Sequence, residues 1–418
     1  VLSRRDTLDL TATTDSEATM TTFAIVGASL AGLSAASTLR RGDADASIVV
    51  VDPATELPAD RPPLSKQVLS GEWEPDRAHQ PLANKVGDLG LDLRLGTAAT
   101  VLDVAARTLS LSDGTQVVSD GIVLAMGASA RSLPGPALAG VHVVRELADS
   151  LALRSELDAG PSRVGVIGAG FIGAEVAATC RERGLDVTMI EAAPTPMLRA
   201  FPEQIGAFVA DLHRDHGTDV RLGVGVAGLI DGGDGRVAGI GLADGTTVDA
   251  DVVVVGIGVT PNTGWLDGSG LDLSNGVVCD SSTLAAPGIT AAGDVASWVN
   301  EHFGEAMRVE HWEHAIEHGE AAAARLLGGD PSAVPFLSVP WFWSDQYDLK
   351  IQMAGRPSGD DELHLMEGSF EERRFVVAFR RGDRCTGVLG VGRPRHVMQA
   401  RMRLRESLDW APIAELLT

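Results

Sequence analysis

The sequence is poor in cysteine and in aromatic residues. Only three cysteines (Cys180, Cys279 and Cys385) occur among 418 residues, and they lie far apart along the chain. This spacing excludes a disulfide scaffold and a zinc site built on paired cysteines, and it fits a reducing, cytoplasmic setting. Aromatic residues make up only 4% of the chain, with a single tyrosine. We therefore expect no aromatic platform on which nucleic acid bases could stack.

Positive charge and long apolar runs are also scarce. The formal net charge is −23 at pH 7, and because an acidic protein repels phosphates we expect no nucleic acid partner. The longest apolar run, residues 252–259, is far shorter than the roughly 20 residues that span a bilayer. Residues 1–21 are polar and contain no apolar segment. They predict a disordered leader, or residues upstream of a start at Met20, and neither an export signal nor a membrane span.

One kind of unit occurs twice in the chain. In the first copy, a strand-like run at residues 22–26 leads into a turn that contains Gly27, Ser29 and Gly32. An alanine-rich helical pattern follows, and the next strand-like run ends at Asp52. A strand, a crossover helix and a second strand within about 30 residues indicate a βαβ unit of a parallel sheet.

The second copy has the same order of parts. A strand-like run at residues 163–167 leads into a glycine-rich turn, a helical pattern follows, and the next strand ends at Glu191. The residues of this turn that we assign to nucleotide binding are Gly168, Gly170, Ile172 and Gly173. The two copies together predict an α/β fold with two Rossmann-like dinucleotide-binding domains.

Each turn has the chemistry that a dinucleotide needs. Glycines let the backbone approach a pyrophosphate, the helix N-terminus supplies N–H groups, and the acid accepts the ribose hydroxyls. Ser29 stands where the middle glycine of the first turn is expected, and its side chain is a small intrusion. Two such sites in one chain predict FAD at one and a nicotinamide dinucleotide at the other.

Three further residues bear on the cofactors. Glu191 favours NADH over NADPH because a carboxylate repels a 2′-phosphate, although Arg199, the nearest following cation, could offset this. Asp294 follows a glycine after a strand-like run. We expect it to hold a ribityl or pyrophosphate oxygen, while a Gly-Asp pair alone is more typical of a helix cap.

The chain divides further along its length. A proline- and glycine-rich linker at residues 134–136 marks a domain boundary. After about residue 335 the motifs stop, and short β-like runs precede a basic helical tail. This pattern predicts a third, α+β domain at residues 335–418.

Five motifs in the same order resemble one known family. They begin at Arg61-Pro62-Pro63-Leu64-Ser65-Lys66 and include Gly258-Val259-Thr260-Pro261-Asn262, Gly293-Asp294, Glu310-His311-Trp312 and Phe342-Trp343-Ser344-Asp345-Gln346. Together they resemble the FAD-dependent, NADH-using ferredoxin reductases of oxygenase systems, the family of putidaredoxin reductase and biphenyl dioxygenase ferredoxin reductase. The resemblance implies a glutathione-reductase-like fold. It further implies a discontinuous FAD domain at residues 22–130 and 256–334, and an NAD domain at residues 131–255.

The resemblance also implies roles for single residues. Arg61 and Lys66 would lie beside the flavin, with Lys66 near N5, and Glu175 would point at the nicotinamide. Trp312 and the helix that it opens would face the pyrimidine end of the flavin, where a helix N-terminus favours negative charge. Lys66, Glu175 and Trp312 are thus the expected catalytic residues. Gly127, Arg131 and Gly258 complete the expected cofactor contacts.

Cysteine placement then decides how electrons leave. Disulfide reductases of this fold need a thiol pair beside the flavin, and no cysteine lies within residues 60–75. Electrons must therefore pass directly from the flavin to an external acceptor, which the resemblance identifies as an iron–sulfur ferredoxin that serves a cytochrome P450 or a ring-hydroxylating dioxygenase. His311, His314 and His318 have helical spacing. They lack acidic or cysteine partners, so we expect no metal site.

The acceptor should be drawn to a basic stretch. Residues 373–405 contain ten arginines and one aspartate, a charge of +9, so the remaining chain carries −23 − 9 = −32. Such a stretch could steer and orient an acidic ferredoxin. Alternatively, the arginines could pack their aliphatic stems along a solvated helix.

The sequence is also compatible with two other functions. The first is a reductase of the same fold that acts on rubredoxin, a quinone or another small acceptor. The second is a non-catalytic flavoprotein, a redox sensor of the apoptosis-inducing-factor type. The sequence does not fix the oligomeric state.

Overall fold

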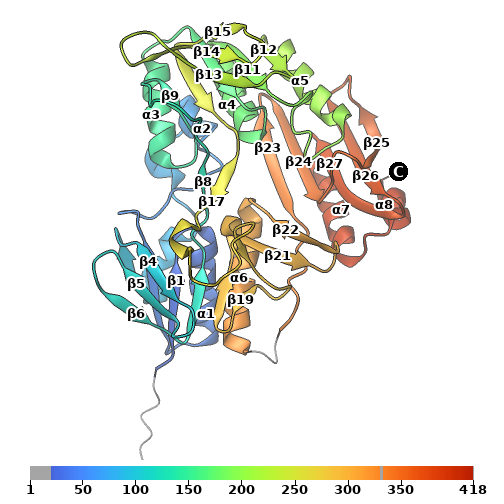
Figure 1. The fold of residues 1–418 in the computed structure, drawn as a ribbon. Coiled ribbons are helices and arrows are strands. Elements are labelled where there is room, and N and C mark those ends of the chain that lie inside the picture. Colours follow the sequence, from blue (N-terminus) through green and yellow to red (C-terminus); the bar gives the residue numbers. More distant parts are fainter. Residues whose placement is uncertain (1–19, 330–332, 418) are drawn as a thin grey trace, which may run out of the picture.

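The computed structural model describes residues 20–329 and 333–417, so most of the predicted leader at residues 1–21 lies outside the described residues. Three layered units are visible in Figure 1, coloured from blue through green to red along the chain. None of the helices within the described ranges combines the length and the hydropathy that crossing a bilayer requires.

The first unit is built on a six-stranded sheet that collects strands from two distant parts of the chain. Its strand order is β19-β20-β7-β1-β2-β3, and β1 pairs in parallel with both β2 and β7. The strands are β1 (Thr22–Val26), β2 (Ser47–Asp52), β3 (Asp92–Leu95), β7 (Gly121–Leu124), β19 (Leu284–Ala286) and β20 (Ile289–Ala291). The pairing of β20 with β7 brings residues near 290 back into the domain begun by residue 22.

Alternating side chains of β1 bury both faces of this sheet. Phe23 and Ile25 pack beneath the helices α1 (Leu30–Gly42) and α6 (Trp312–Gly328), whereas Ala24 and Val26 pack on the opposite side. That opposite side is covered by a three-stranded sheet of β4 (Ala99–Asp103), β5 (Thr108–Leu111) and β6 (Gln116–Val118). Burial on both faces explains why β1 and β2 are continuous apolar runs rather than alternating ones.

The second unit repeats this plan. Its five-stranded sheet has the order β12-β11-β10-β16-β9, and every pairing in it is parallel. The strands are β9 (Val141–His142), β10 (Arg163–Ile167), β11 (Asp186–Glu191), β12 (Asp219–Leu222) and β16 (Val252–Val255). The helices are α3 (Leu147–Asp158), α4 (Phe171–Glu182) and α5 (Glu203–Asp215), and an antiparallel sheet contains β13 (Val226–Asp231), β14 (Val237–Leu242) and β15 (Thr247–Asp249).

Two short strands carry the chain between these units. β8 (Ala128–Ala130) and β17 (Val259–Pro261) pair antiparallel and cross side by side from the lower to the upper part of Figure 1. The predicted domain boundaries fall next to these strands. We keep the division into residues 22–130 with 256–334, 131–255 and 335–418 as a proposal.

The C-terminal unit is an antiparallel sheet with the order β23-β24-β27-β26-β25. Its elements are β23 (Trp341–Gln346), β24 (Leu349–Gly355), β25 (Glu362–Ser369), β26 (Arg374–Arg381), β27 (Arg384–Val391), α7 (Pro394–Glu406) and α8 (Trp410–Leu417). One face packs under α7 and α8, and the other packs against α5 through Phe375, Phe379 and Phe208. The C-terminal sheet is thereby fixed against the second unit.

Short elements complete the described chain. They are α2 (Gln67–Ser70), η1 (Pro75–Ala78), η2 (Ala83–Leu89), η3 (Gly264–Leu266), β18 (Val277–Val278), η4 (Gly293–Val295), β21 (Ala296–Asn300) and β22 (Glu305–Arg308). The predicted fold class is confirmed: an α/β protein with two Rossmann-like units and a C-terminal α+β unit.

Candidate active site

The two glycine-rich turns have nearly the same geometry. Gly27 has φ +107° and Gly168 has φ +98°, and a Cβ on either would lie 2.4 Å from a backbone oxygen of the neighbouring strand end. A Cβ on Gly32 or Gly173 would come still closer, 1.8 and 2.0 Å from the carbonyl oxygens of Gly27 and Gly168. Only glycine allows these strand-to-helix turns to close.

Gly170 differs from these four glycines. Its φ of −75° is accessible to any residue, and nothing lies within 4 Å of a Cβ built on it. The fold therefore does not require glycine here. Open space above a helix N-terminus is what a pyrophosphate needs, so the second turn fits a dinucleotide. Ile172, on the first turn of α4, is exposed beside this space.

The first turn also fits a nucleotide. Ser29 is the N-cap residue of α1, and its hydroxyl accepts a hydrogen bond from Arg61 Nη1 at 3.2 Å. Two buried polar atoms beside this turn, Arg61 Nε and Gln80 Oε1, have no partner among the described residues. Buried polar atoms without partners are uncommon, and here they offer a hydrogen-bond donor and an acceptor to a bound group.

Each turn is locked to an acid at the end of the following strand. Asp52 accepts hydrogen bonds from the backbone N–H of Ala28 at 2.7 Å and of Ala54 at 2.8 Å. Glu191 accepts the corresponding bonds from Ala169 and Ala193, both at 2.9 Å. The two carboxylates are thus fixed in equivalent places on the two copies. Arg199 is exposed in the segment before α5.

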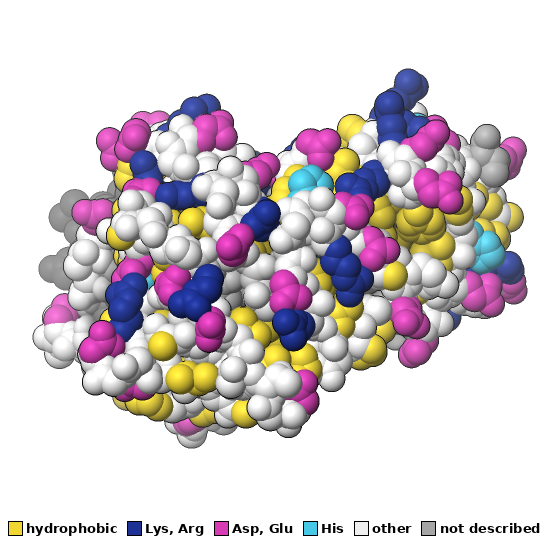
Figure 2. Space-filling view, turned by 90° about the horizontal axis from the view of Figure 1, so that it is seen from above, with side chains coloured by type: hydrophobic (Ala, Val, Ile, Leu, Met, Phe, Trp, Pro, Cys, Tyr) yellow, Lys and Arg dark blue, Asp and Glu magenta, His cyan; other side chains and the backbone are white. Residues whose placement is uncertain are grey.

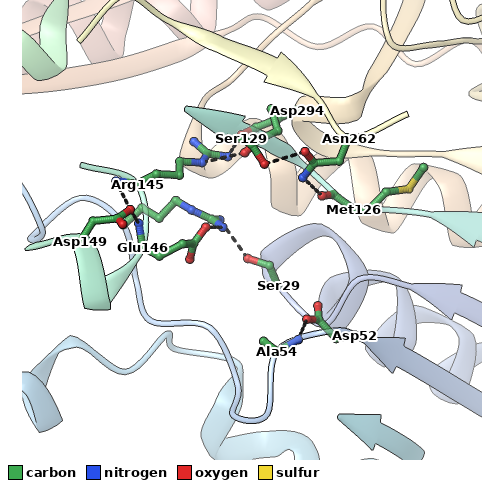
Figure 3. Close-up of polar contacts among 12 residues, drawn as sticks. Ser29, Asp52, Ala54, Met126, Ser129, Arg145, Glu146, Asp149, Asn262 and Asp294 are labelled. Carbon is green, nitrogen blue, oxygen red and sulfur yellow. Dashed lines mark hydrogen bonds and ion pairs between the residues drawn. The ribbon is translucent and has the colours of Figure 1, made fainter. Parts of the chain in front are cut away.

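Between the two units lies a set of polar contacts that Figure 3 shows. Asp294, in η4, forms an ion pair with Arg145 at 2.6 Å, and both side chains are about 15% exposed (15% and 14%). Arg145 also donates to the carbonyl oxygen of Ala128 in β8. Asn262 donates to the carbonyl oxygen of Met126, and Ser129 donates to Asn262. Sequence reasoning assigned Asp294 and missed Arg145, which belongs to no motif.

The predicted residues along the two crossing strands are less buried. The backbone N–H of Arg131 donates to the carbonyl oxygen of Gly258, and its side chain donates to the carbonyl oxygen of Val259. Gly127 and Gly258 have φ of +64° and +94°; the nearest atom to a Cβ built on Gly127 is Arg145 Nη2 at 3.9 Å, and nothing lies within 4 Å of one built on Gly258. These three residues outline the crossing rather than a closed pocket.

One buried charged group joins all three units. Lys66 Nζ lies 3.1 Å from Glu175 Oε1, with side-chain exposures of 12% and 4%. Glu175 also accepts hydrogen bonds from the hydroxyl of Ser65 at 2.5 Å and from that of Ser344 at 2.7 Å. Lys66 and Ser65 precede α2, Glu175 lies on α4, and Ser344 lies on β23. Sequence reasoning paired neither serine with Glu175.

Trp312 begins α6, as predicted. Its indole N–H donates to Asp60 at 2.6 Å, and burial is the main reason that the pKa of Asp60 is raised. Its ring lies 6.3 Å from that of Trp343, in an edge-on arrangement. Trp312 therefore links the segment before Lys66 to the C-terminal sheet.

His314 and His318 of this helix are buried in the core, and His311, the residue before the helix, is half-buried. Burial lowers the pKa of His311 to about 4 and that of His318 to about 3, so both are neutral at physiological pH. His314 stacks on Trp298 with ring centroids 4.8 Å apart. Within the described ranges, no group of three or more histidine, cysteine or acidic side chains is arranged to hold a metal ion.

Comparison with known proteins gives the family. The chain matches the pyridine nucleotide-disulphide oxidoreductase family over residues 21–319 and the reductase C-terminal family over residues 341–414. The chain belongs to the pyridine nucleotide-disulphide oxidoreductase family. Rhodocoxin reductase of Rhodococcus erythropolis is 38% identical over 394 residues, which are 93% of this chain and 90% of that protein.

Two further relatives define the branch of the family. The anthranilate 1,2-dioxygenase system ferredoxin–NAD(+) reductase component of Burkholderia cepacia is 39% identical, covering 91% of this chain and 93% of that protein. The solved covalent putidaredoxin reductase–putidaredoxin complex matches with a TM-score of 0.87 and 32% identity, covering 95% of each chain. The predicted resemblance to ferredoxin reductases of oxygenase systems is confirmed.

The disulphide chemistry in the family's name has no counterpart in this chain. All three cysteines are free and buried, and burial raises the pKa of each thiol to about 12. A thiol with that pKa remains protonated at neutral pH, and the thiolate is the nucleophile in disulfide exchange. The two glycine-rich turns of this chain are therefore not accompanied by a reactive thiol.

Proposed function

We propose that this oxidoreductase transfers electrons from NADH through FAD to an iron–sulfur ferredoxin, which serves a cytochrome P450 or a ring-hydroxylating dioxygenase. The observation that carries the proposal is a glycine-rich turn of the same geometry on each Rossmann-like sheet, with one buried ion pair between them and no cysteine pair in the sequence. The family uses FAD and NAD(H). Bound FAD would accept a hydride from NADH and release its electrons singly.

The chain's own residues would bind and orient the two cofactors. We assign FAD to the first turn with Gly27, Ser29, Gly32, Asp52, Arg61, Gly127, Arg131, Gly258 and Asp294, and NADH to the second with Gly168, Gly170, Ile172, Gly173, Glu191 and Arg199. Lys66 would hold positive charge beside the flavin, positioned by Glu175. Trp312 would close the opposite end of the site.

Stopped-flow reduction of the purified flavoprotein by NADH, followed by transfer to a panel of ferredoxins, tests this function. We expect rapid loss of flavin absorbance and cytochrome c reduction that depends on added ferredoxin. Reduction of a quinone or rubredoxin in preference to every ferredoxin would identify the other type of reductase. Slow loss of flavin absorbance at saturating NADH would instead identify a redox sensor.

We also propose a cytoplasmic location, which the three buried free thiols support.

Glu191 should set the choice of coenzyme. Two backbone hydrogen bonds fix its carboxylate beside the second turn, and this supports its assignment to the ribose of the coenzyme. Glu191→Ala should weaken NADH binding by about tenfold, the cost of roughly one hydrogen bond to a charged group, and should reduce discrimination against NADPH. Steady-state kinetics with both coenzymes measure the change. An unchanged ratio of kcat/KM for NADH and NADPH would refute the role of Glu191.

We propose that the ferredoxin docks near residues 373–405. Seven of the ten arginines there form ion pairs with carboxylates, so the local positive charge is smaller than the sequence suggests. Figure 2 shows acidic and basic side chains interspersed over the visible face. Among the described residues of this stretch, the other three arginines, Arg374, Arg384 and Arg395, are exposed and form no ion pair, but Arg384 is held by a hydrogen bond to the carbonyl oxygen of His302, which leaves Arg374 and Arg395. These two arginines are the best candidates for contact with an acidic partner.

Charge reversal tests this docking site. Arg374→Glu combined with Arg395→Glu should raise the KM for ferredoxin about tenfold at low salt, and the difference should shrink as salt screens the charges. Ferricyanide reduction should be unchanged. Lys85→Glu, in η2 of the first unit, is the net-charge control for each of the two single reversals, because it also replaces one cation by one carboxylate. An equal loss of both activities in the double variant would show that the two arginines are structural.

A further inference from the structure

Hydrogen bonds continue from Glu175 beyond the ion pair with Lys66. The hydroxyl of Ser344 donates to Glu175 at 2.7 Å, and the amide nitrogen of Gln346 donates to Ser344 at 3.2 Å. The amide oxygen of Gln346 lies 3.2 Å from His213 Nε2, and the hydroxyl of Tyr347 lies 3.0 Å from His213 Nδ1. We call Ser344, Gln346, His213 and Tyr347 the Glu175 chain.

Every bond in the Glu175 chain has the same direction. An amide oxygen can only accept, so His213 must carry its proton on Nε2 and donate it to Gln346. Burial lowers the pKa of His213 to about 4, so at neutral pH the ring has one proton and Nδ1 accepts from Tyr347. The single proton of Ser344 is then left for Glu175. Each member therefore donates toward the carboxylate.

These polar side chains lie where apolar ones are usual. Ser344, Gln346 and His213 are fully buried, with 0% exposure, and Glu175 is 3% exposed. Ser344 and Gln346 are two apart on β23 and so share one face, which is turned toward the second unit. A buried polar group is costly unless its partners are complete, and here the partners come from β23, α5 and α4.

Tyr347 shows a second sign of a role beyond packing. It is the only tyrosine in the chain, and it occupies the two-residue connection between β23 and β24. Its φ is +54°, a conformation in which glycine or asparagine is usual. Its ring stacks on His216 with centroids 3.7 Å apart and an interplanar angle of 9°. This backbone conformation holds the phenol hydroxyl against His213.

We infer that the Glu175 chain consists of positioning residues, which orient Glu175 and through it Lys66 beside the flavin. The inference rests on the proposed function, which places Lys66 and Glu175 at the flavin. Aligned hydrogen bonds polarise one another, so the chain strengthens the last bond onto the carboxylate. It does not conduct protons, because the amide of Gln346 cannot readily accept a proton on oxygen and release another from nitrogen. The Glu175 chain thus holds the charge of Glu175 in place and does not transfer a proton.

Removing the two ends of the chain tests the inference. Ser344→Ala deletes the bond onto Glu175, and Tyr347→Phe deletes only the outermost hydroxyl and keeps the stacked ring. Thr386→Val is the matched control, because Thr386 is a buried residue of the same sheet whose hydroxyl donates to another carboxylate, Asp361, at 2.7 Å. Each of the three variants loses one hydroxyl group; Ser344 and Thr386 are buried and Tyr347 is half-buried.

Two readouts are compared in the FAD-loaded proteins. The first is the flavin midpoint potential, measured by photoreduction without NADH, and the second is the limiting rate of flavin reduction at saturating NADH. Ser344→Ala should lower the rate about tenfold, as expected for the loss of one hydrogen bond to a charged group, and should shift the potential to more negative values. Tyr347→Phe should lower the reduction rate about twofold and should also shift the midpoint potential to more negative values. Thr386→Val should change neither.

The outcomes separate this inference from the proposed function. A wild-type protein that binds FAD but is not reduced by NADH would refute the function, while the potentials would still test the chain. If the wild type reacts rapidly and Ser344→Ala retains both its rate and its potential, the inference is wrong. Should Ser344→Ala fail to fold, Tyr347→Phe decides, and wild-type values for that variant would also overturn the inference.

Discussion

Lys66→Met should lower the free energy of unfolding by about 3 kcal/mol, because it leaves the Glu175 carboxylate buried without its cation. That carboxylate is only 4% exposed, so water cannot replace the ammonium group. The same change should slow flavin reduction by NADH at least about a hundredfold. Such a loss corresponds to roughly 2.7 kcal/mol of transition-state stabilisation, a usual cost of removing one positioned charge.

A double variant separates the two effects. Lys66→Met with Glu175→Gln removes the buried charge as well as its partner, so most of the stability should return, while hydride transfer should remain slow. Denaturant unfolding measures the first quantity and stopped-flow absorbance the second. Coupling of the two residues is expected because their side chains are in contact. If flavin reduction by NADH is as fast in Lys66→Met as in the wild type, Lys66 has no role in hydride transfer.

The nucleotide-binding turns could be predicted from sequence because their requirements are local. A turn at φ near +100° with a carbonyl oxygen 2.4 Å from any Cβ admits only glycine. The glycines at positions 27 and 168 therefore indicate these turns in the sequence itself. The acids are equally local, since Asp52 and Glu191 each end the strand beside their turn. Helix, strand and turn are specified here within about 30 residues.

The contacts between units could not be predicted in this way. Arg145 and Asp294 are 149 residues apart, and Glu175 and Ser344 are 169 residues apart. Each of these pairs exists only because separate sheets pack together, and no spacing in the sequence records that packing. The same holds for the Glu175 chain, whose members lie on α5, on β23 and in the turn after it.

Charge counting failed to describe the basic stretch for a related reason. Arg401 is 5% exposed and contacts both Glu313 and Glu317 of α6, so it contributes to the interior rather than to a surface potential. Arg381 contacts Asp361, which is fully buried. A sum over residues 373–405 includes these arginines and omits the carboxylates that neutralise them. The distribution of charge depends on partners from outside the counted segment.

Gly168→Ala and Gly170→Ala should behave very differently although they lie in one turn. The first places a Cβ 2.4 Å from the carbonyl oxygen of Gly256 at a φ of +98°, so we expect a loss of at least about 2 kcal/mol in the free energy of unfolding. The second meets nothing within 4 Å at a φ of −75°. Its stability should stay within about 0.5 kcal/mol of the wild type.

Gly170→Ala should weaken coenzyme binding even though it leaves the stability of the protein nearly unchanged. Gly170→Ala leaves the fold intact but occupies the space that we assign to the pyrophosphate, so the Kd for NADH should rise at least about tenfold, which is roughly 1.4 kcal/mol. Thermal unfolding of both variants and titration with NADH make the comparison, with FAD content as a check on the first turn. If Gly170→Ala binds NADH as tightly as the wild type, the open space above α4 is not the pyrophosphate site, because a methyl group there would obstruct a bound phosphate.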